Sequence, residues 1–179
     1  MPATTAEPDL RYPVGKSDLR SPLSQGDREI FIANIQATPK HLRAAVAGLS
    51  KDQFQTPYRP GGWTVLQTVH HIADSHMNAY IRFKLALTEE APTVKPYDEA
   101  LWAKLADSDA PPEVSLSLMD NIHERWVRML HAMTSADFGR KLTHPERGQM
   151  DLDQMLCLYD WHGRHHVAHI TSLRQRNGW

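Results

Sequence analysis

The chain has 179 residues, of which 41% are hydrophobic and 23% charged, a length and composition typical of one globular domain with a single core. Its formal net charge of -1 comes from 20 basic and 21 acidic side chains interspersed along the sequence. Because no basic stripe is present to meet a phosphate backbone, this pattern argues against nucleic acid and favours a small molecule as the partner.

The sequence also carries no signal for a membrane or for export. No apolar run reaches the roughly 18 residues that a membrane span needs, and residues 1–24 have neither the basic start nor the apolar middle of a signal peptide. The single cysteine, Cys157, has no partner for an intrachain disulfide, which agrees with a reducing compartment. We therefore predict a cytoplasmic protein with no membrane partner.

The first predicted elements are an extended arm and a long helix. Residues 1–24 contain four prolines and little hydrophobic periodicity, which predicts an arm rather than a separate domain. From about Gln25 to Leu49, apolar residues recur at helical spacing. We expect the first helix there, with a bend or an interruption at Pro39.

A second helix is predicted to begin after Thr64 and to run to about Leu87. Thr64 is followed three residues later by Gln67, the pattern of a capping box at the start of a helix. A proline-bounded connection of about 25 residues comes next, with room for a short helix around Glu99 to Leu105. Connections of this length often carry function.

Two further helices complete the prediction. Apolar residues at helical spacing from Leu116 to Met133 mark the third. Asp151 with Gln154 repeats the capping pattern, so the fourth is expected to start there and to run to about residue 175.

Together these elements define the expected fold class. The stretch 142–150 between the last two helices is predicted to be a turn, and no strand of any length is expected. Four long amphipathic helices with one long connection predict an all-α four-helix bundle, in a single domain that spans residues 1–179.

Four of the eleven histidines lie within residues 162–169 of the last helix. His162 and His166 continue an apolar row that is expected to face the bundle. Two imidazoles four residues apart on a helix can bind one metal ion, with ring nitrogens about 2.0–2.1 Å from zinc. His165 can pair with His169 at the same spacing, so spacing alone leaves the pair open.

The inward position of His162 and His166 favours a metal site over a hydrogen-bonded core cluster. Two neutral imidazoles in a core still need hydrogen-bond partners, and two charged ones would repel each other and lose solvation. A bound ion resolves both problems at once.

A third ligand is expected from the second helix. His70 lies on a packing row, whereas His71 shares a row with polar residues that faces either solvent or a polar cavity around the ion. The other histidines are predicted to be structural or surface residues: His41, His76, His123, His131 and His144.

Long stretches of the chain resemble the DinB/YfiT-like four-helix proteins, and more closely their YfiT branch of metal-dependent hydrolases and bacillithiol S-transferases. The similarity is densest in "TPYRPGGWTVLQTVHHIADSHMNAYIRFKLALTEEAPTVKPYDEALW" and returns in "HPERGQMDLDQMLCLYDWHGRHHVAHI". The resemblance implies a homodimer and one divalent ion per subunit, Zn²⁺ or Ni²⁺, held by three histidines. It implies His71, His162 and His166 as those ligands.

The activity implied by this resemblance is that of a metal-dependent thiol S-transferase or hydrolase. In the transferase hypothesis, the ion binds a low-molecular-weight thiol of the bacillithiol type as thiolate, which attacks an electrophilic substrate. In the hydrolase hypothesis, a metal-bound hydroxide attacks a carbonyl. The sequence lacks "HExxH", whose Glu would act as a base in peptide hydrolysis, and this absence favours thiol chemistry over proteolysis. A third hypothesis is a non-catalytic stress-response module stapled by the metal.

Three polar residues are candidates for contacting the substrate or for orienting a ligand imidazole: Asn78, Arg82 and Asp160. Arg82 can bind a carboxylate of the thiol substrate through two hydrogen bonds. Imidazole ligands suit both zinc and nickel, so the sequence leaves the native metal open.

One glycine and three tryptophans have predicted positions in the core or at a pocket. Gly163, inside the last helix, predicts close approach of a neighbouring helix or of a substrate. Trp126 and Trp161 fall on helical rows and are predicted in the core, whereas Trp63 begins a helix beside a glycine pair and is predicted at the mouth of a pocket.

Overall fold

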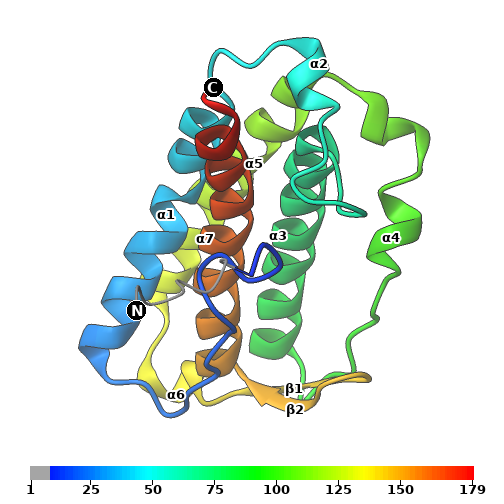
Figure 1. Cartoon of the computed structure of the whole chain (residues 1–179). Coiled ribbons are helices and arrows are strands. Elements are labelled where there is room, and N and C mark those ends of the chain that lie inside the picture. Colours follow the sequence, from blue (N-terminus) through cyan, green and yellow to red (C-terminus); the bar gives the residue numbers. More distant parts are fainter. Residues whose placement is uncertain (1–8) are drawn as a thin grey trace, which may run out of the picture.

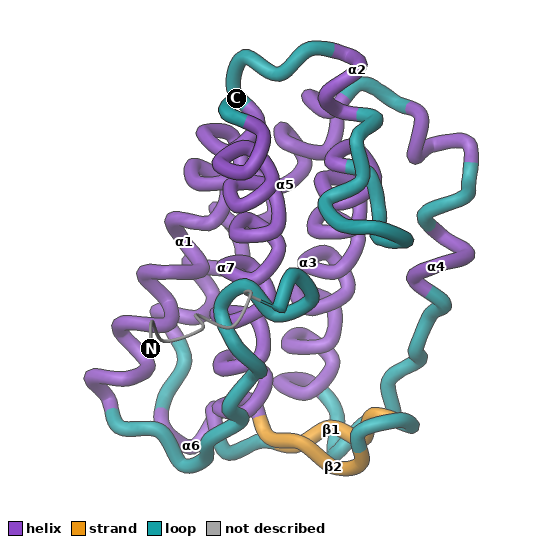
Figure 2. Tube along the Cα trace, in the orientation of Figure 1, coloured by secondary structure: helices purple, strands orange, loops and turns teal. Residues whose placement is uncertain are grey.

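The computed structural model describes residues 9–179, which form a bundle of four long helices (Figure 1). The all-α four-helix bundle predicted from the sequence pattern is confirmed, and Figure 2 shows how little of the chain is strand. The long helices are α1 (Gln25–Val46), α3 (Val65–Thr88), α5 (Pro112–Ala132) and α7 (Leu152–Asn177). The short elements are α2 (Lys51–Phe54), α4 (Glu99–Trp102), the 3-10 helix η1 (Ala106–Asp109), α6 (Ser135–Phe138), β1 (Lys141–His144) and β2 (Gly148–Asp151).

The order of the helices around the bundle differs from their order in the chain. α1 packs against α5 and α7, and α3 packs against the same two helices, so α1 and α3 lie on one diagonal. Figure 1 shows that α1 and α7 run in one direction and that α3 and α5 run in the other. Because α3 and α5 are parallel neighbours, the chain must return along the bundle between them. Residues 89–111 make that return and carry α4 with them.

The helix starts lie where the capping patterns predict. Thr64 caps α3 and Asp151 caps α7. The side chain of each cap accepts a hydrogen bond from the backbone N–H three residues on, and the side-chain oxygen of that residue accepts one from the backbone N–H of the cap. Pro39 lies inside α1, which continues through it to Val46. Of the two outcomes expected at Pro39, a bend or an interruption, the interruption is wrong, since the tertiary packing of α1 keeps the helix continuous.

The N-terminal arm has no regular secondary structure in its described part, whereas the segment before α7 contains two short strands. Residues 1–8 of the predicted arm lie outside the described part of the chain, and residues 9–24 contain turns but no helix or strand. Residues 142–150, expected to be a turn without strands, instead belong to an antiparallel hairpin of β1 and β2 with Lys141 opposite Asp151. Four-residue strands are too short for apolar alternation to reveal them.

The buried apolar residues form two clusters stacked along the bundle. One contains Phe83, Trp126 and Leu156, and the other contains Ile72 and Ile170. Along the helices, His76 of α3, His123 of α5 and His166 of α7 fall between the residues of one cluster and those of the other. None of the helices within residues 9–179 combines the length and the apolar character of a membrane span.

Candidate metal centre

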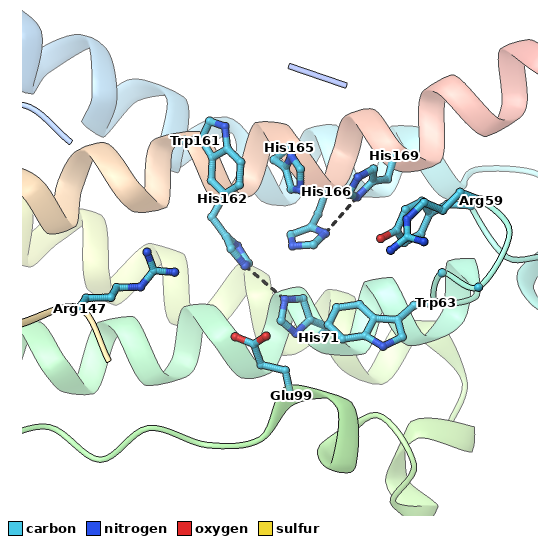
Figure 3. Close-up of a pocket in the computed structure, with 13 residues that line it drawn as sticks. Arg59, Trp63, His71, Glu99, Arg147, Trp161, His162, His165, His166 and His169 are labelled. Atoms are coloured by element: carbon cyan, nitrogen blue, oxygen red, sulfur yellow. Dashed lines mark hydrogen bonds between the residues drawn. The ribbon is translucent and has the colours of Figure 1, made fainter. Parts of the chain in front are cut away.

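Three histidines from two helices bring ring nitrogens together at one point. They are His71 of α3 and His162 and His166 of α7, and one nitrogen from each lies within 4.8 Å of the other two. Nε2 of His71 lies 3.3 Å from Nε2 of His162 (Figure 3). Two nitrogens bound to one zinc ion at about 2.0–2.1 Å with a tetrahedral angle are about 3.3 Å apart. The geometry of this first triad therefore fits a shared divalent ion.

Burial keeps the three imidazoles of the first triad neutral. It lowers the pKa of His71 to about 4, and it lowers the pKa values of His162 and His166 well below the usual value. The neutral imidazole is the form that binds a metal. The triad is thus held in its ligating state at neutral pH.

A second triad shares His166 with the first. His165, His166 and His169 are all buried, and one ligand nitrogen from each lies within 4.8 Å of the others. Nδ1 of His165 is buried and has no hydrogen-bond partner among residues 9–179. The indole of Trp161 stacks on the ring of His165 at 4.2 Å between centroids. Helical spacing leaves open whether His162 pairs with His166 or His165 pairs with His169. The distances between the rings do not decide between these pairs either.

The first triad opens into a pocket of about 410 Å³. Its wall includes the loop before α3, one face of α7, and residues from the long connection and from the hairpin turn. Figure 3 shows Arg59 and Arg147 at opposite ends of the pocket. Neither guanidinium forms an ion pair with a carboxylate anywhere in residues 9–179.

A carboxylate that the sequence analysis missed also faces the triad. Glu99 begins α4, and in Figure 3 its carboxylate points toward the ring of His71. Desolvation at the pocket wall raises the pKa of Glu99. No glutamate is adjacent in sequence to His71, His162 or His166, whereas α4 brings Glu99 to them from the long connection. The length of that connection was the one signal that pointed to it.

The three polar candidates lie away from the pocket. Asn78 donates to the backbone oxygen of Asp74 on its own helix at 2.9 Å, and Asp160 accepts from Nδ2 of Asn34 on α1 at 2.7 Å. Arg82 is buried and donates to the backbone oxygen of Lys95 at 3.1 Å. It also lines a smaller cavity of about 90 Å³ that shares the ring of His162. Of the three, only Arg82 adjoins a ligand ring.

The tryptophans and the helix glycine divide between core and pocket. Trp63 lines the pocket, as predicted, with its ring 4.4 Å from that of His71 between centroids. Trp126 is fully buried, but Trp161, also expected in the core, is only partly buried and lines the pocket. A Cβ at Gly163 would lie 2.7 Å from Oγ1 of Thr38. The close approach predicted at Gly163 is therefore that of helix α1.

Similar proteins were found in three comparisons. Residues 34–170 match the family model of the DinB superfamily. Two proteins of Bacillus cereus, from strains B4264 and G9842, carry the name "Putative metal-dependent hydrolase" and are 50% identical over 171 residues, 96% of this chain and 99% of each relative. The solved structure of YfiT from Bacillus subtilis, titled "a probable metal-dependent hydrolase with an unusual four-helix bundle topology", matches with a TM-score of 0.93 and 46% identity over 95% of this chain and 98% of that one.

The fold and the histidine triads define a class of helical bundle proteins with a metal-binding centre between two helices. The chain belongs to the DinB superfamily and is of the YfiT type. The names of its relatives agree with an enzyme that depends on a metal ion.

Proposed function

We propose that the protein binds one divalent ion, Zn²⁺ or Ni²⁺, through His71, His162 and His166, and that it activates a small nucleophile, a thiol or a water molecule, for attack on an electrophilic substrate. When bound, such an ion lowers the pKa of a thiol or a water at its open coordination position and so supplies a nucleophile at neutral pH. The observation that carries the proposal is the convergence of three neutral imidazoles on an open pocket. Three protein ligands with one open position are typical of catalytic zinc sites.

The walls of the pocket indicate the class of substrate. Arg59 and Arg147 lie at its two ends without carboxylate partners in residues 9–179. A guanidinium binds a carboxylate through two parallel hydrogen bonds. Trp63 and Trp161 add flat apolar surface between the charged ends. These contacts suit small molecules with acidic groups on either side of the reacting atom.

Transfer of a low-molecular-weight thiol of the bacillithiol type is the first candidate reaction. A thiol that carries carboxylates is held by the two arginines with its sulfur toward the triad. Glu99, whose pKa is raised, accepts the proton of the thiol as a general base. The sulfur then forms a bond to an electrophilic carbon of the second substrate, and the leaving group departs with its electron pair.

Hydrolysis is the second candidate, and Glu99 can act as the general base in this reaction as well. A carboxylate that faces the ligand rings can take a proton from a water molecule as readily as from a thiol. The missing "HExxH" excludes only a glutamate beside the ligand histidines in sequence, whereas Glu99 comes from α4. The names of the Bacillus relatives, which describe metal-dependent hydrolases, support this candidate as well.

Metal analysis followed by two assays tests the proposal. We expect about one equivalent of zinc or nickel in protein purified without chelators or nickel resin, and loss of the ion in His71→Ala but not in His70→Gln. Protein loaded with that ion is then given a thiol with a haloalkyl bimane, and separately a panel of esters and amides. Product in the first assay supports transfer, and product in the second supports hydrolysis. A bound ion without product in either assay would contradict both reactions and favour the third hypothesis, a non-catalytic module stapled by the metal.

The assembly and location stay predictions. We propose a homodimer in the cytoplasm, with no nucleic-acid partner. Light scattering of the purified protein should give twice the mass of the 20.4 kDa chain, and a monomer would contradict the dimer.

A further inference from the structure

A chain of hydrogen bonds runs from the metal centre into the core of the bundle. Nδ1 of His162 lies 3.2 Å from Nε2 of His76. Nδ1 of His76 lies 2.9 Å from Nε2 of His123 on α5, and Nδ1 of His123 lies 2.7 Å from the backbone oxygen of Ile35 on α1. We call this chain the core relay. It links all four long helices at the level of the ligands.

The far end of the core relay determines its direction. A carbonyl oxygen can only accept, so Nδ1 of His123 must carry a proton. A neutral imidazole has one donor and one acceptor, so Nε2 of His123 accepts from Nδ1 of His76. By the same rule, Nε2 of His76 accepts from Nδ1 of His162. Nε2 of His162 is then left with a free lone pair, and this is the nitrogen that faces His71.

The direction holds because the inner rings of the core relay are neutral. His76 and His123 are buried, and no carboxylate in residues 9–179 is hydrogen-bonded to either ring. An imidazolium at His123 would donate from both nitrogens and would reverse the relay. Burial lowers the pKa of His123 to about 4, so this reversal does not occur at neutral pH.

Pro39 explains why the carbonyl of Ile35 is available. In an α-helix, the oxygen of residue 35 accepts from the N–H of residue 39. Residue 39 is a proline inside α1 and has no N–H to donate. The oxygen of Ile35 therefore lacks its helical donor, and the ring of His123 supplies one instead. Pro39, a residue type that usually breaks helices, thus leaves the oxygen of Ile35 free to accept the last hydrogen bond of the core relay.

A shorter relay acts in the same way on His166. Nδ1 of His166 lies 3.3 Å from Nδ1 of His169, and Nε2 of His169 lies 3.3 Å from the backbone oxygen of Arg11. We call this the arm relay. Since the carbonyl accepts from Nε2 of His169, Nδ1 of His169 accepts from Nδ1 of His166. Nε2 of His166 is left with the lone pair.

We infer that His76, His123 and His169 are positioning residues that set the tautomers of His162 and His166, so that both rings present Nε2 as the ligand atom. The inference deepens the proposed function, because it takes His162 and His166 as metal ligands. It also decides between the two triads. With its proton on Nδ1 and its lone pair on Nε2, His166 cannot use the nitrogen nearest to His169 as a ligand, so the ion belongs with His71 and His162.

The first test needs no substitution. Long-range ¹H–¹⁵N NMR of histidine-labelled, chelator-treated protein at neutral pH distinguishes the two tautomers of each ring. We expect the proton on Nδ1 at His76, His123, His162 and His166, and on Nε2 at His169. Added zinc should leave the tautomers of His162 and His166 unchanged. An Nε2–H tautomer at His76 or His123 would overturn the core relay, whether or not the protein shows any activity.

The second test measures what the core relay does for the ion. His123→Phe keeps an aromatic ring but removes both hydrogen bonds, and we expect mixed tautomers at His162 and zinc affinity lower by about 10- to 100-fold in competition with a chelator, the usual effect of removing an outer hydrogen-bond partner. His70→Phe is the matched control, because His70 is a buried histidine bonded to Ser115 and to the backbone of Ala110 but not to a ligand. A folded His123→Phe protein with unchanged affinity and a single His162 tautomer would refute the role.

Two further variants separate the two relays. Pro39→Ala returns an N–H to the oxygen of Ile35, where it competes with His123, and should lower zinc affinity by a smaller factor than His123→Phe. His169→Phe should disturb the tautomer of His166 and leave that of His162 intact. If Pro39→Ala left the tautomer of His123 and the affinity unchanged, the proline would have no part in the relay.

Discussion

The start of α7, around Asp153, and its histidine segment, residues 162–169, both place buried polar side chains in the bundle but satisfy their polar groups in different ways. At the start of α7, Asp153 accepts 2.8 Å hydrogen bonds from Nε and Nη2 of Arg28 and another from the backbone of Leu23. In the histidine segment, His162 and His166 are hydrogen-bonded through Nδ1, and each retains a nitrogen for the pocket. Burial therefore does not distinguish structural from functional residues here. The difference is whether the chain itself satisfies every donor and acceptor.

The comparison predicts the largest loss of stability at the start of α7. Asp153→Ala leaves the guanidinium of Arg28 buried without its counter-charge, and we expect the free energy of unfolding to fall by about 3–5 kcal/mol. Urea titration of chelator-treated protein measures this loss. The control is Asp120→Ala, which removes a partly exposed ion pair with Arg43 and should cost less than about 1 kcal/mol. Equal losses in the two variants would contradict the distinction.

The histidine segment of α7 should contribute to binding of the ion rather than to the stability of the fold without it. At a free zinc concentration of about 100 times Kd, the ion adds about 2.7 kcal/mol to the free energy of unfolding. His166→Ala should lose this gain, because the ion keeps only two of its protein ligands. In chelator its stability should stay close to that of the unmodified chain. Melting temperatures measured with and without zinc test both statements, and a zinc-dependent rise in His166→Ala would exclude His166 as a ligand.

Acid should lower the stability of the protein first through its buried histidines, before it affects the ion pair of Asp153 with Arg28 at the start of α7. Burial holds the pKa values of His71 and His123 at about 4, while a histidine in the unfolded chain has a pKa of about 6.5. Between these values the unfolded state binds more protons, so the free energy of unfolding falls as the pH falls. For His123 alone, the loss at about pH 5.5 is about 1.4 kcal/mol. Urea titrations of chelator-treated protein at about pH 7.5, 6.5 and 5.5, on either side of the pKa of an unfolded histidine, measure this trend. A constant free energy of unfolding would contradict it.

The smallest expected effect lies at the close approach of α1 to α7, beside the ligands. In Gly163→Ala the new methyl group meets Thr38; overpacking typically costs about 1–3 kcal/mol, and the better helix propensity of alanine returns up to about 1 kcal/mol. We expect a net loss of about 1 kcal/mol in urea titrations. In a Thr38→Ala background the same change should be neutral or stabilising. A loss that persists there would point to another cause.

Local rules were sufficient for the helices and for one face of the site. Apolar spacing and capping boxes placed α3 and α7, and steps of three and four put His162 and His166 on the same inward row. These features depend on neighbours within about one helical turn, so the sequence contains all that is needed to predict them. The hairpin of β1 and β2 was missed because its strands are too short to show a period.

The partners of those histidines could not be predicted in this way. His76 and His123 were expected to be structural or surface residues, and Glu99 lay in a connection without assigned chemistry. Each acquires its role from a residue on another element: His162 for His76, Ile35 for His123, and the first triad for Glu99. No local period encodes which residues of different helices stand at the same height in a bundle.

By itself, then, the sequence determined the four helices, their caps and buried faces, and the inward histidine pair, because these follow from backbone geometry and the periodic placement of apolar side chains. The tertiary structure alone decided the site. It brought His71 to that pair, placed Glu99 and two arginines around the pocket, and aligned the oxygen freed by Pro39 with the ring of His123. Hydrogen bonds and metal coordination act over about 2–3 Å, so only the packing of distant segments can create them.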